Sequence, residues 1–506
     1  MLDYIDNKIN SIAMYRLVVY GLGLISLVSI IFSVLSLIDY PVVNLIASLV
    51  FFVSTGYLIN KLLAGLLKLD TNFESWLITA LILYLIMPPV VTYRDFIPLF
   101  FSILVGIGSK FVFKLNNAHV FNPAAIGAVF VSLLGISGAS WWVATPWLLP
   151  IVLITGFGIA RKIRKLKMVI VFIITTYASS LSQMYIKGIT PDLNLLYELT
   201  FSWPIFFLGL YMLTEPLTTP SKNVLQLIYA AIVGILFGIK FNLSVLYSTP
   251  ELALCIANLY SYIVSPKQKY ILTLLEKNKL SKNIYEFVFK PSKKLNFAAG
   301  QYLEWTLDHS NIDSRGNRRY FTIASSPTED NIRLAVKVFD NSSSFKSSLV
   351  NLVKTDKITV SHLSGEFTLP NDIRQKLIFV SGGIGVTPFR SMIKYLIDSN
   401  QKRDIVHFHL NNMETDIAYR ELFDEAESKL GIKTVYVLSD KENVSKTWKG
   451  ETGYLTAEIV NKYLTDVEHR TVFISGPSVM VNAYKKLFRQ LGLKASRIVT
   501  DYFPGF

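Results

Sequence analysis

A short run of residues carries the side chains that could hold a flavin. Arg319, Tyr320, Phe321 and Thr322 place a cation, two aromatic rings and a hydroxyl in immediate succession. An arginine can pair with a pyrophosphate, an aromatic face can stack on an isoalloxazine, and a threonine hydroxyl can lie near the reactive nitrogen of that ring. The same run also fits an ordinary barrel strand with its aromatic rings packed inward, so these residues alone leave both interpretations open.

A second run, downstream, fits a dinucleotide. Gly382, Gly383 and Gly385 precede Thr387 and Pro388, between an apolar stretch and a helix that we expect to begin at the proline. Glycines let the backbone approach an anionic pyrophosphate, and the following helix offers free N–H groups and the positive end of its dipole. A lone glycine-rich turn is weak evidence, and its place between a strand and a helix strengthens it.

The elements that position these runs follow from the uneven composition of the chain. Of its 506 residues, 51% are hydrophobic and 17% are charged, and the mean hydropathy is +0.41, which is too apolar for an ordinary soluble protein. Long apolar runs fill the first half, whereas the second half has the composition of a soluble α/β protein. We therefore expect a transmembrane domain at 1–265, an antiparallel β-barrel at 266–372 and a doubly wound α/β domain at 373–506.

A helix needs roughly 20 residues to cross a bilayer. Counting the apolar runs of about that length predicts about ten transmembrane helices in two repeats. The net charge of +14 does not indicate nucleic acid, because many lysines and arginines of the first half lie in short loops between apolar runs. Such loops mark the cytoplasmic side. We therefore expect an integral protein of the bacterial cytoplasmic membrane, in contact with lipid, whose soluble domains face the cytoplasm. No cleavable signal peptide is evident at the N-terminus.

Three stretches of the apolar half are unusual. Residues 116–125, which include Asn122, and residues 214–220, which begin with Thr214 and Glu215, place polar groups and prolines at the ends of apolar runs. Broken helices in matching positions of two halves indicate a ligand site between repeats, although ordinary loops with capping residues have the same composition. The third stretch, 137–146, contains tryptophans that could also form an interfacial aromatic belt.

These stretches resemble the flavin-carrying membrane subunits of the sodium-pumping NADH:quinone reductases and of the Rnf complexes (the NqrB/RnfD family). The resemblance rests on His-Val-Phe-Asn-Pro-Ala-Ala at 119–125 and Thr-Glu-Pro-Leu-Thr-Thr-Pro at 214–220. It implies FMN in the membrane domain, joined through a phosphoester to the last residue of a Ser/Thr-Gly-Ala-Thr motif. Ser140 ends Ser-Gly-Ala-Ser, and Thr145 offers a threonine in a similar frame, so either residue could carry FMN, and noncovalent FMN or no FMN also stays open.

Two residue counts exclude other redox groups. Cys255 is the single cysteine, so the chain can build neither a disulfide nor a cysteine-ligated iron–sulfur cluster. His119 is the only histidine before residue 265, whereas two transmembrane haems need histidine pairs on helices. We therefore expect no haem relay and no metal site.

The soluble half resembles the ferredoxin-NADP reductase superfamily, with FAD on a barrel and NAD(P)H on an α/β domain. Arg319 to Thr322 fit its Arg-x-Tyr-Ser/Thr pattern with Phe321 in the tyrosine position, and Gly300-Gln301-Tyr302 lies where the barrel turns toward the flavin. Further positions carried over from the family are a second FAD segment with Ser344 and Lys346, the nicotinamide motif with Gly383, Gly385, Thr387 and Pro388, the run Ser475, Gly476 and Pro477, and a terminal aromatic residue, Phe503.

The resemblances together imply a membrane flavoprotein oxidoreductase. Thr322 would hydrogen-bond the flavin, Phe321 would stack on it, and Ser475 and Phe503 would lie beside the reacting rings. Electrons would pass from cytoplasmic NAD(P)H through FAD and a membrane flavin to a quinone or to a flavinylated protein outside. Residues 411–414 lack a lysine or arginine for a 2′-phosphate, which favours NADH.

Two other functions stay open from the sequence. The first is a transporter-like membrane protein whose flavin domain is a redox sensor, and the second is a diaphorase that is merely anchored to the membrane. Ion pumping coupled to electron flow rests on analogy alone.

Overall fold

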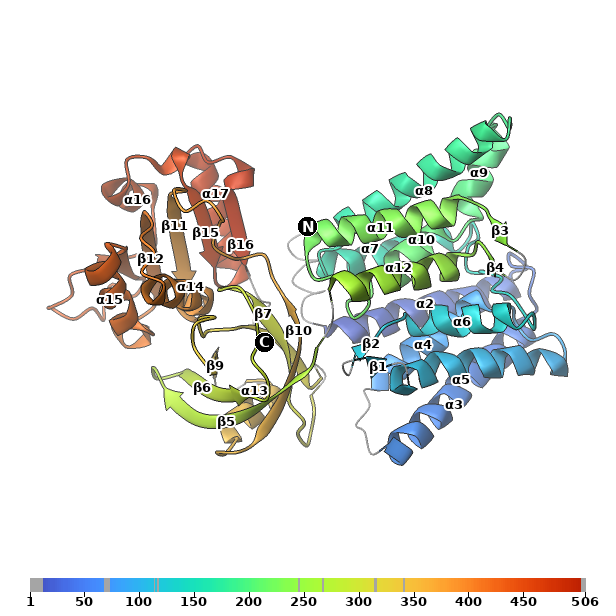
Figure 1. Cartoon of the computed structure of the whole chain (residues 1–506), viewed down its shortest axis with the longest axis horizontal. Coiled ribbons are helices and arrows are strands. Elements are labelled where there is room, and N and C mark those ends of the chain that lie inside the picture. Colours follow the sequence, from blue (N-terminus) through green and yellow to red (C-terminus); the bar gives the residue numbers. More distant parts are fainter. Residues whose placement is uncertain are drawn as a thin grey trace. The chain divides into compact units, whose positions relative to one another are not determined.

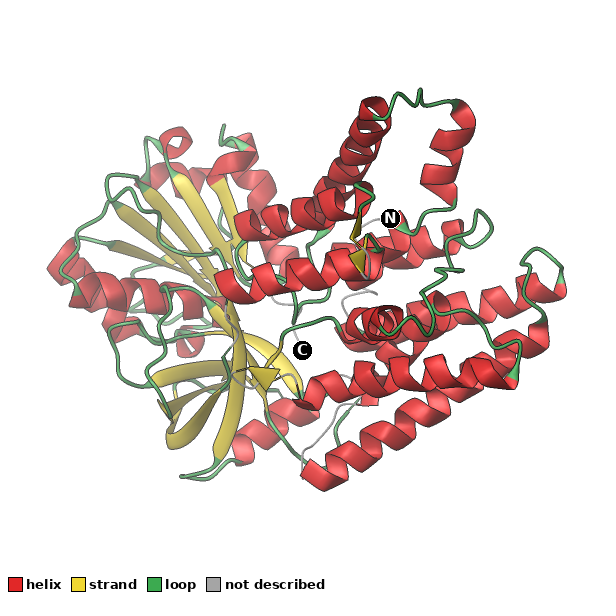
Figure 2. Ribbon diagram, turned by 45° about the vertical axis from the view of Figure 1, so that its right-hand side comes forward, coloured by secondary structure: helices red, strands yellow, loops and turns green. Residues whose placement is uncertain are grey.

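In this computed structural model the described residues are 12–67, 73–112, 114–115, 118–243, 246–265, 268–313, 316–339 and 342–501. The chain divides into two compact units, residues 1–268 and 269–506. Helices make up most of the first unit, whereas the second contains both six-stranded sheets (Figures 1 and 2).

The first unit is a bundle of apolar helices. Five helical segments of the described residues are long and apolar enough to cross a membrane: α2 (Met14–Val34), α3 (Val42–Leu67), η1 with α5 (Tyr93–Val112), α8 (Leu166–Ile186) and α9 to η2 (Leu193–Met212). The others are α4 (Phe73–Ile86), α6 (Pro123–Leu133), α7 (Leu149–Lys162), α11 (Asn223–Gly238) and α12 (Pro250–Val264). Helix α6 has 11 residues and α12 has 15, so at about 1.5 Å per residue neither spans 30 Å.

The sequence predicted about ten spanning helices, and the structure differs because some of the helices are too short to cross a membrane. Each apolar run does contain a helix, but α6 and α12 each follow a small hairpin, β1–β2 (Lys114–Leu115 with Ala118–His119) and β3–β4 (Asn242–Leu243 with Leu246–Tyr247). Both helices begin with proline in the first turn, after the N-caps Asn122 and Thr249. The two hairpins lie at opposite ends of the bundle (Figure 1). The repeated motif is therefore hairpin and short helix, and residues 214–220 are not its second copy.

The second unit begins with a barrel-like antiparallel sheet, here called the barrel lobe. Its strand order is β8-β7-β10-β5-β6-β9. The strands are β5 (Tyr270–Lys279), β6 (Ile284–Pro291), β7 (Tyr302–Thr306), β8 (Arg318–Thr322), β9 (Ile332–Lys337) and β10 (Lys357–Ser364). Helix α13 (Ser344–Asn351) contributes Phe345 and Leu349 to the core between the strands. The expectation of a small antiparallel barrel is confirmed.

The rest of the unit is a parallel sheet with helices on both faces, here called the nucleotide lobe. Its strand order is β14-β13-β12-β11-β15-β16. The strands are β11 (Leu377–Gly382), β12 (Ile405–Asn411), β13 (Lys433–Leu438), β14 (Glu451–Thr452), β15 (Thr471–Ser475) and β16 (Ile498–Asp501), and the helices are α14 (Thr387–Asp398), α15 (Arg420–Leu430), α16 (Ala457–Tyr463) and α17 (Ser478–Gln490). Strand β11 alternates between two cores, one with α14 and α15 and the other with α16 and α17. The doubly wound domain is therefore confirmed.

The two lobes share buried side chains. Ile284 and Ala299 of the barrel lobe lie in one core with residues of β11 and α14. Phe367, in the segment that joins the lobes, packs edge-on against Phe389 and Phe473 at 5.5 and 5.2 Å between ring centroids. Burying apolar surface from both lobes in one core fixes their relative position.

Gly300 tests this shared core. Its φ is +96°, and a Cβ at this position would lie 2.1 Å from the Phe367 carbonyl oxygen and 2.6 Å from the Met392 Cε of α14. We expect Gly300→Ala to destabilise the second unit by about 3 kcal/mol, because both the backbone conformation and the contact become strained. Thermal release of noncovalent flavin from the purified protein measures the change.

The control is Gly316→Ala. Gly316 has a φ of +76°, but a Cβ there would meet no atom within 4 Å. Only the cost of the left-handed backbone conformation then applies, and we expect the free energy of unfolding to fall by about 1 kcal/mol. Equal losses at the two glycines would contradict the packing argument.

Candidate functional site

Two of the predicted flavin residues lie on one face of β8. The strand pairs with β7 so that Phe321 is opposite Leu303 and Arg319 is opposite Trp305. Paired residues of antiparallel strands point to the same side, so Arg319 and Phe321 face the barrel core. Both reach Phe345 of α13: the Arg319 guanidinium lies 5.4 Å from its ring centroid, and the Phe321 ring lies 5.8 Å away.

The N-terminus of α13 joins Arg319 in a place that suits an anion. Ser343 caps the helix by accepting the Lys346 backbone N–H at 3.4 Å. Asp313 Oδ2 accepts the Ser344 backbone N–H at 3.0 Å, and Asp313 Oδ1 lies 3.6 Å from Arg319 Nη2. A carboxylate of the chain thus already bridges the helix N-terminus and the guanidinium. The structure brings together the predicted residues of the FAD pyrophosphate site, and its donors fit that group.

Thr322 and Tyr320 point to the opposite face of β8 from Phe321. The Tyr320 hydroxyl donates to Glu304 Oε2 at 2.8 Å, and its ring packs edge-on against Tyr302 at 5.7 Å. Thr322 is 4% exposed, and its Oγ1 has no hydrogen-bond partner among the described residues. An orphaned buried hydroxyl at the end of this strand fits a ligand atom as its partner.

The predicted nicotinamide residues meet at the carboxyl edge of the parallel sheet. Strand β15 pairs with β11 and β16 so that Ser475 lies opposite both Ser381 and Asp501. This is where the strand order reverses, which is the usual ligand crevice of such sheets. The structure therefore places three chain segments at one edge: 381–388, 475–477 and Asp501. Phe503 lies outside the described residues.

The structure requires glycine at different positions of this edge on different physical grounds. A Cβ on Gly385 would lie 2.4 Å from the Ser475 carbonyl oxygen, and one on Gly382 would lie 2.1 Å from Met480 Sδ. Gly383 has a φ of +53° and would meet no atom within 4 Å. Gly382 and Gly385 therefore let two turns pack closely, and Gly383 leaves an open backbone for a phosphate.

Helix α14 begins directly at this turn. Thr387 is its first residue, Pro388 lies in its first turn, and the Thr387 hydroxyl donates to the Ile384 carbonyl at 3.2 Å. The glycine turn runs into the helix without a break, and the Thr387 N–H donates to the Ile384 carbonyl. Gly476 and Pro477 pack against the turn from the other side. The residues fit a dinucleotide pyrophosphate at this position.

The buried histidines of β12 are not acid–base groups of this site. His407 and His409 are fully buried and stack on each other at 5.3 Å. Burial lowers the pKa of His409 to about 3, and burial with the neighbouring histidine lowers the pKa of His407. Both rings are therefore uncharged at pH 7, and His407 Nε2 lies 2.8 Å from the Ser381 hydroxyl.

In the first unit, some of the predicted residues form a polar cluster. Asn122 Nδ2 donates to Glu215 Oε2 at 2.9 Å, and His119 Nε2 lies 3.6 Å from Glu215 Oε1. Thr214 takes no part, because its hydroxyl donates to the Leu210 carbonyl at 2.8 Å. The cluster joins stretches 93 residues apart in the sequence.

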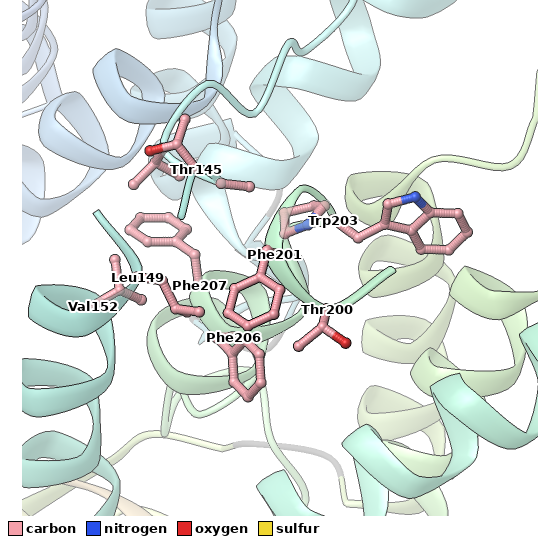
Figure 3. A pocket seen from close by; sticks show the side chains of 11 residues that line it. Thr145, Leu149, Val152, Thr200, Phe201, Trp203, Phe206 and Phe207 are labelled. Carbon is pink, nitrogen blue, oxygen red and sulfur yellow. The ribbon is translucent and has the colours of Figure 1, made fainter. Parts of the chain in front are cut away.

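The two candidate anchors for FMN have different surroundings. Thr145 borders a small, mostly apolar pocket whose lining includes the aromatic rings of Phe201, Trp203, Phe206 and Phe207 (Figure 3). Ser140 is exposed and does not line this pocket. Its hydroxyl lies 3.5 Å from the Ile86 carbonyl. The sequence alone ranked the two residues equally.

Several residues near these sites were missed by sequence reasoning. Asp313 was assigned only to a turn, and Arg420 was overlooked because it follows β12 by nine positions. Arg420 Nη1 nevertheless lies 3.3 Å from Glu414 Oε1, and its guanidinium lies over the rings of Tyr436 and Trp448 at 5.2 and 5.9 Å. The sequence-based predictions rest on the spacing of residues within single motifs, and such spacing cannot predict contacts between separate segments.

Comparison with known proteins agrees with the geometry of the second unit. Residues 271–368 match the family described as oxidoreductase FAD-binding domain, and residues 379–486 match the oxidoreductase NAD-binding domain. Both matches lie in the second unit, so the resemblance of the first unit to the NqrB/RnfD family stays a prediction.

Two curated proteins resemble the second half of the chain. The glycine betaine monooxygenase reductase subunit of Pseudomonas aeruginosa is 26% identical over 43% of this chain and 57% of its own length. The flavohemoprotein of Bacillus subtilis is 27% identical over 46% of this chain and 58% of its own length. The chain thus spans little more than half the length of these relatives. The crystal structure of the Amycolatopsis cytochrome P450 reductase GcoB is 23% identical over 47% of this chain and 70% of its own, with a TM-score of 0.43.

The second unit therefore carries an oxidoreductase FAD-binding domain and an oxidoreductase NAD-binding domain, similar to those of the ferredoxin-NADP reductases.

Proposed function

We propose that the protein takes electrons from cytoplasmic NADH at its second unit and delivers them through its membrane-embedded first unit to a quinone or to a flavinylated protein on the outer side. The observation that carries this proposal is the combination, in one chain, of an FAD- and NAD-binding unit with a unit containing five helices long and apolar enough to cross a bilayer. FAD supplies the conversion of a two-electron donor into one-electron transfers.

The residues of the second unit bind and orient the two cofactors. Arg319 and the N-terminus of α13 would hold the FAD pyrophosphate, and Phe321 would stack on the isoalloxazine. Gly383 and the first turn of α14 hold the pyrophosphate of the dinucleotide, while Ser475 and Gly476 border the nicotinamide. The described buried histidines are neutral, which is compatible with hydride transfer because that step needs no general acid or base.

Thr322 tests the flavin site. Its buried hydroxyl would hydrogen-bond the flavin, so we expect Thr322→Val to slow reduction of FAD by NADH by about 10- to 100-fold, the effect of losing roughly 1–3 kcal/mol of hydrogen bonding. Thr322→Ser keeps the hydroxyl and should stay within about threefold of the native rate. Rapid-mixing absorbance of the flavin measures both, and equal rates for the valine and serine variants would refute the assignment.

The choice of NADH over NADPH rests on the segment after β12. Glu414 pairs there with Arg420, a cation that would otherwise be available to a 2′-phosphate. We expect Glu414→Gln to improve kcat/KM for NADPH by about tenfold, because a carboxylate is removed and the guanidinium is released. Asp416→Asn removes the same charge from the same short turn without touching this pair, and is the control. If both variants change NADPH use equally, general charge and not Arg420 decides the preference.

Thr145 tests the membrane relay. Thr145 borders a small pocket lined by aromatic rings and Ser140 does not, so Thr145 is the better supported of the two anchors. We expect purified protein to contain acid-released FAD and a second, covalently held FMN. Thr145→Ala should lose the bound FMN and the reduction of the natural acceptor, whereas Ser140→Ala should keep both. FAD as the only flavin would refute the relay and leave a membrane-anchored reductase.

The names of the relatives support a second candidate acceptor. The reductase subunit of a monooxygenase and a flavohemoprotein both suggest an oxygenase or haem protein as the partner of such a flavin unit. NADH oxidation in native membranes separates the candidates. A quinone pathway is stopped when quinone is extracted and restored when it is added back, whereas a soluble protein acceptor is lost when the membranes are washed.

A further inference from the structure

Five side chains form a closed ring between the barrel lobe and the nucleotide lobe. Glu286 of β6, Glu329 of the β8–β9 turn and Arg333 of β9 come from the barrel lobe, and Arg390 of α14 and Tyr419, just before α15, come from the nucleotide lobe. We call this set the interlobe ring.

Each neighbour in the ring is in direct contact with the next. Arg390 binds Glu329 in a fork, with Nη1 donating to Oε2 and Nη2 donating to Oε1 at 3.0 Å. Arg333 donates from Nε to Glu329 Oε1 at 3.0 Å and from Nη1 to Glu286 Oε2 at 2.7 Å. The Tyr419 hydroxyl donates to Glu286 Oε1 at 2.9 Å, and the Arg390 guanidinium lies 5.7 Å from the Tyr419 ring centroid, which closes the ring.

Two members of the ring are buried, the other three are half-buried, and the charges of the ring cancel. Arg390 is 7% exposed and Glu286 is 3% exposed. Two guanidinium groups face two carboxylates, so each charge has an opposite partner. Removing one member of a buried charge pair leaves the other uncompensated, which is much more costly than losing a surface pair. The ring therefore permits little change in the distance between the lobes.

A second set of bonds ties α14 to the segment that follows the flavin strand. Arg390 Nη1 also donates to the Ala324 carbonyl at 3.1 Å, and the Ser391 hydroxyl donates to the Ser325 carbonyl at 2.6 Å. Ala324 is two residues beyond Thr322, and Arg390 is three residues beyond Thr387. One helical turn thus connects the start of the dinucleotide helix with the end of the flavin strand.

We propose that Arg390 and Glu329 are positioning residues that set the spacing between flavin and nicotinamide. In hydride transfer a C–H bond of the dihydronicotinamide breaks and an N–H bond forms on the flavin, so both electrons move with the hydrogen. The reacting atoms must approach to about 3–3.5 Å, and a misplacement of about 1 Å costs roughly 100-fold in rate. The inference rests on the hydride step of the proposed function. It does not depend on which molecule finally accepts the electrons.

The test is anaerobic reduction of FAD by NADH in the full-length protein, followed by rapid mixing. Arg390→Met and the isosteric Glu329→Gln should lower the limiting rate of flavin reduction by about 10- to 100-fold, with the Kd for NADH changed by less than about threefold. The long-wavelength absorbance of the stacked nicotinamide–flavin pair should weaken in parallel, which a loss of stability alone would not produce in the folded fraction.

Lys394→Met is the matched control. Lys394 lies on the same helix and pairs with a carboxylate, Asp398, but this pair lies within α14. Its loss should leave the rate and the absorbance within about twofold of native.

Three outcomes would overturn the proposal. Native rates in both Arg390→Met and Glu329→Gln would remove any positioning role, and a defect confined to the Kd for NADH would assign the ring to binding. A rate that falls only in proportion to lost FAD would make the ring ordinary packing. If NADH fails to reduce FAD in the native protein, the proposed function itself is wrong, and this result is distinct from all three.

Discussion

The close approach of two turns at the edge of the parallel sheet is the constraint on which the reactive site depends. Gly385 lies so near the backbone of Ser475 and Gly476 that no side chain fits between them. This contact fixes where α14 begins, because the helix follows the glycine turn without a linker. Once the start of α14 is fixed, Met392 and Arg390 meet the barrel lobe at defined points. A contact between two backbones thus determines how the cofactor sites face each other.

Much of the second unit could be predicted from its sequence because its signals are local. Alternating strands, a glycine turn between strand and helix, and the run from Arg319 to Thr322 each lie within about ten residues. The contacts of Asp313, Arg390 and Arg420 could not be predicted in this way. Turns separate these residues from their partners, and the length of a turn does not predict the direction of a side chain. The register of the strands and the burial of each residue are set only when the strands pair.

The first unit shows the opposite balance. Composition alone indicated a membrane-embedded half, and each apolar run contains a helix. Hydropathy could not show which helices are too short to span, because α6 and α12 are each preceded by a short hairpin that a sliding average includes in the apolar run. Asn122 and Glu215 were singled out as unusual polar residues in apolar surroundings, but the hydrogen bond between them appears only in the structure.

The open side of the barrel has a consequence for biosynthesis. Strands β8 and β9 are the two edges of the sheet. The segment that follows β8 bridges them, because Ala324 N–H donates to the Arg333 carbonyl and Arg333 N–H donates to Ser325 Oγ. We call this bridge the seam. The groups that hold Ala324 and Ser325 from the other side lie 66 residues later in the chain. A ribosome must therefore release β11 and α14 before Arg390 and Ser391 can bond Ala324 and Ser325. During synthesis the seam closes first through the bonds inside the barrel lobe, and α14 braces it afterwards.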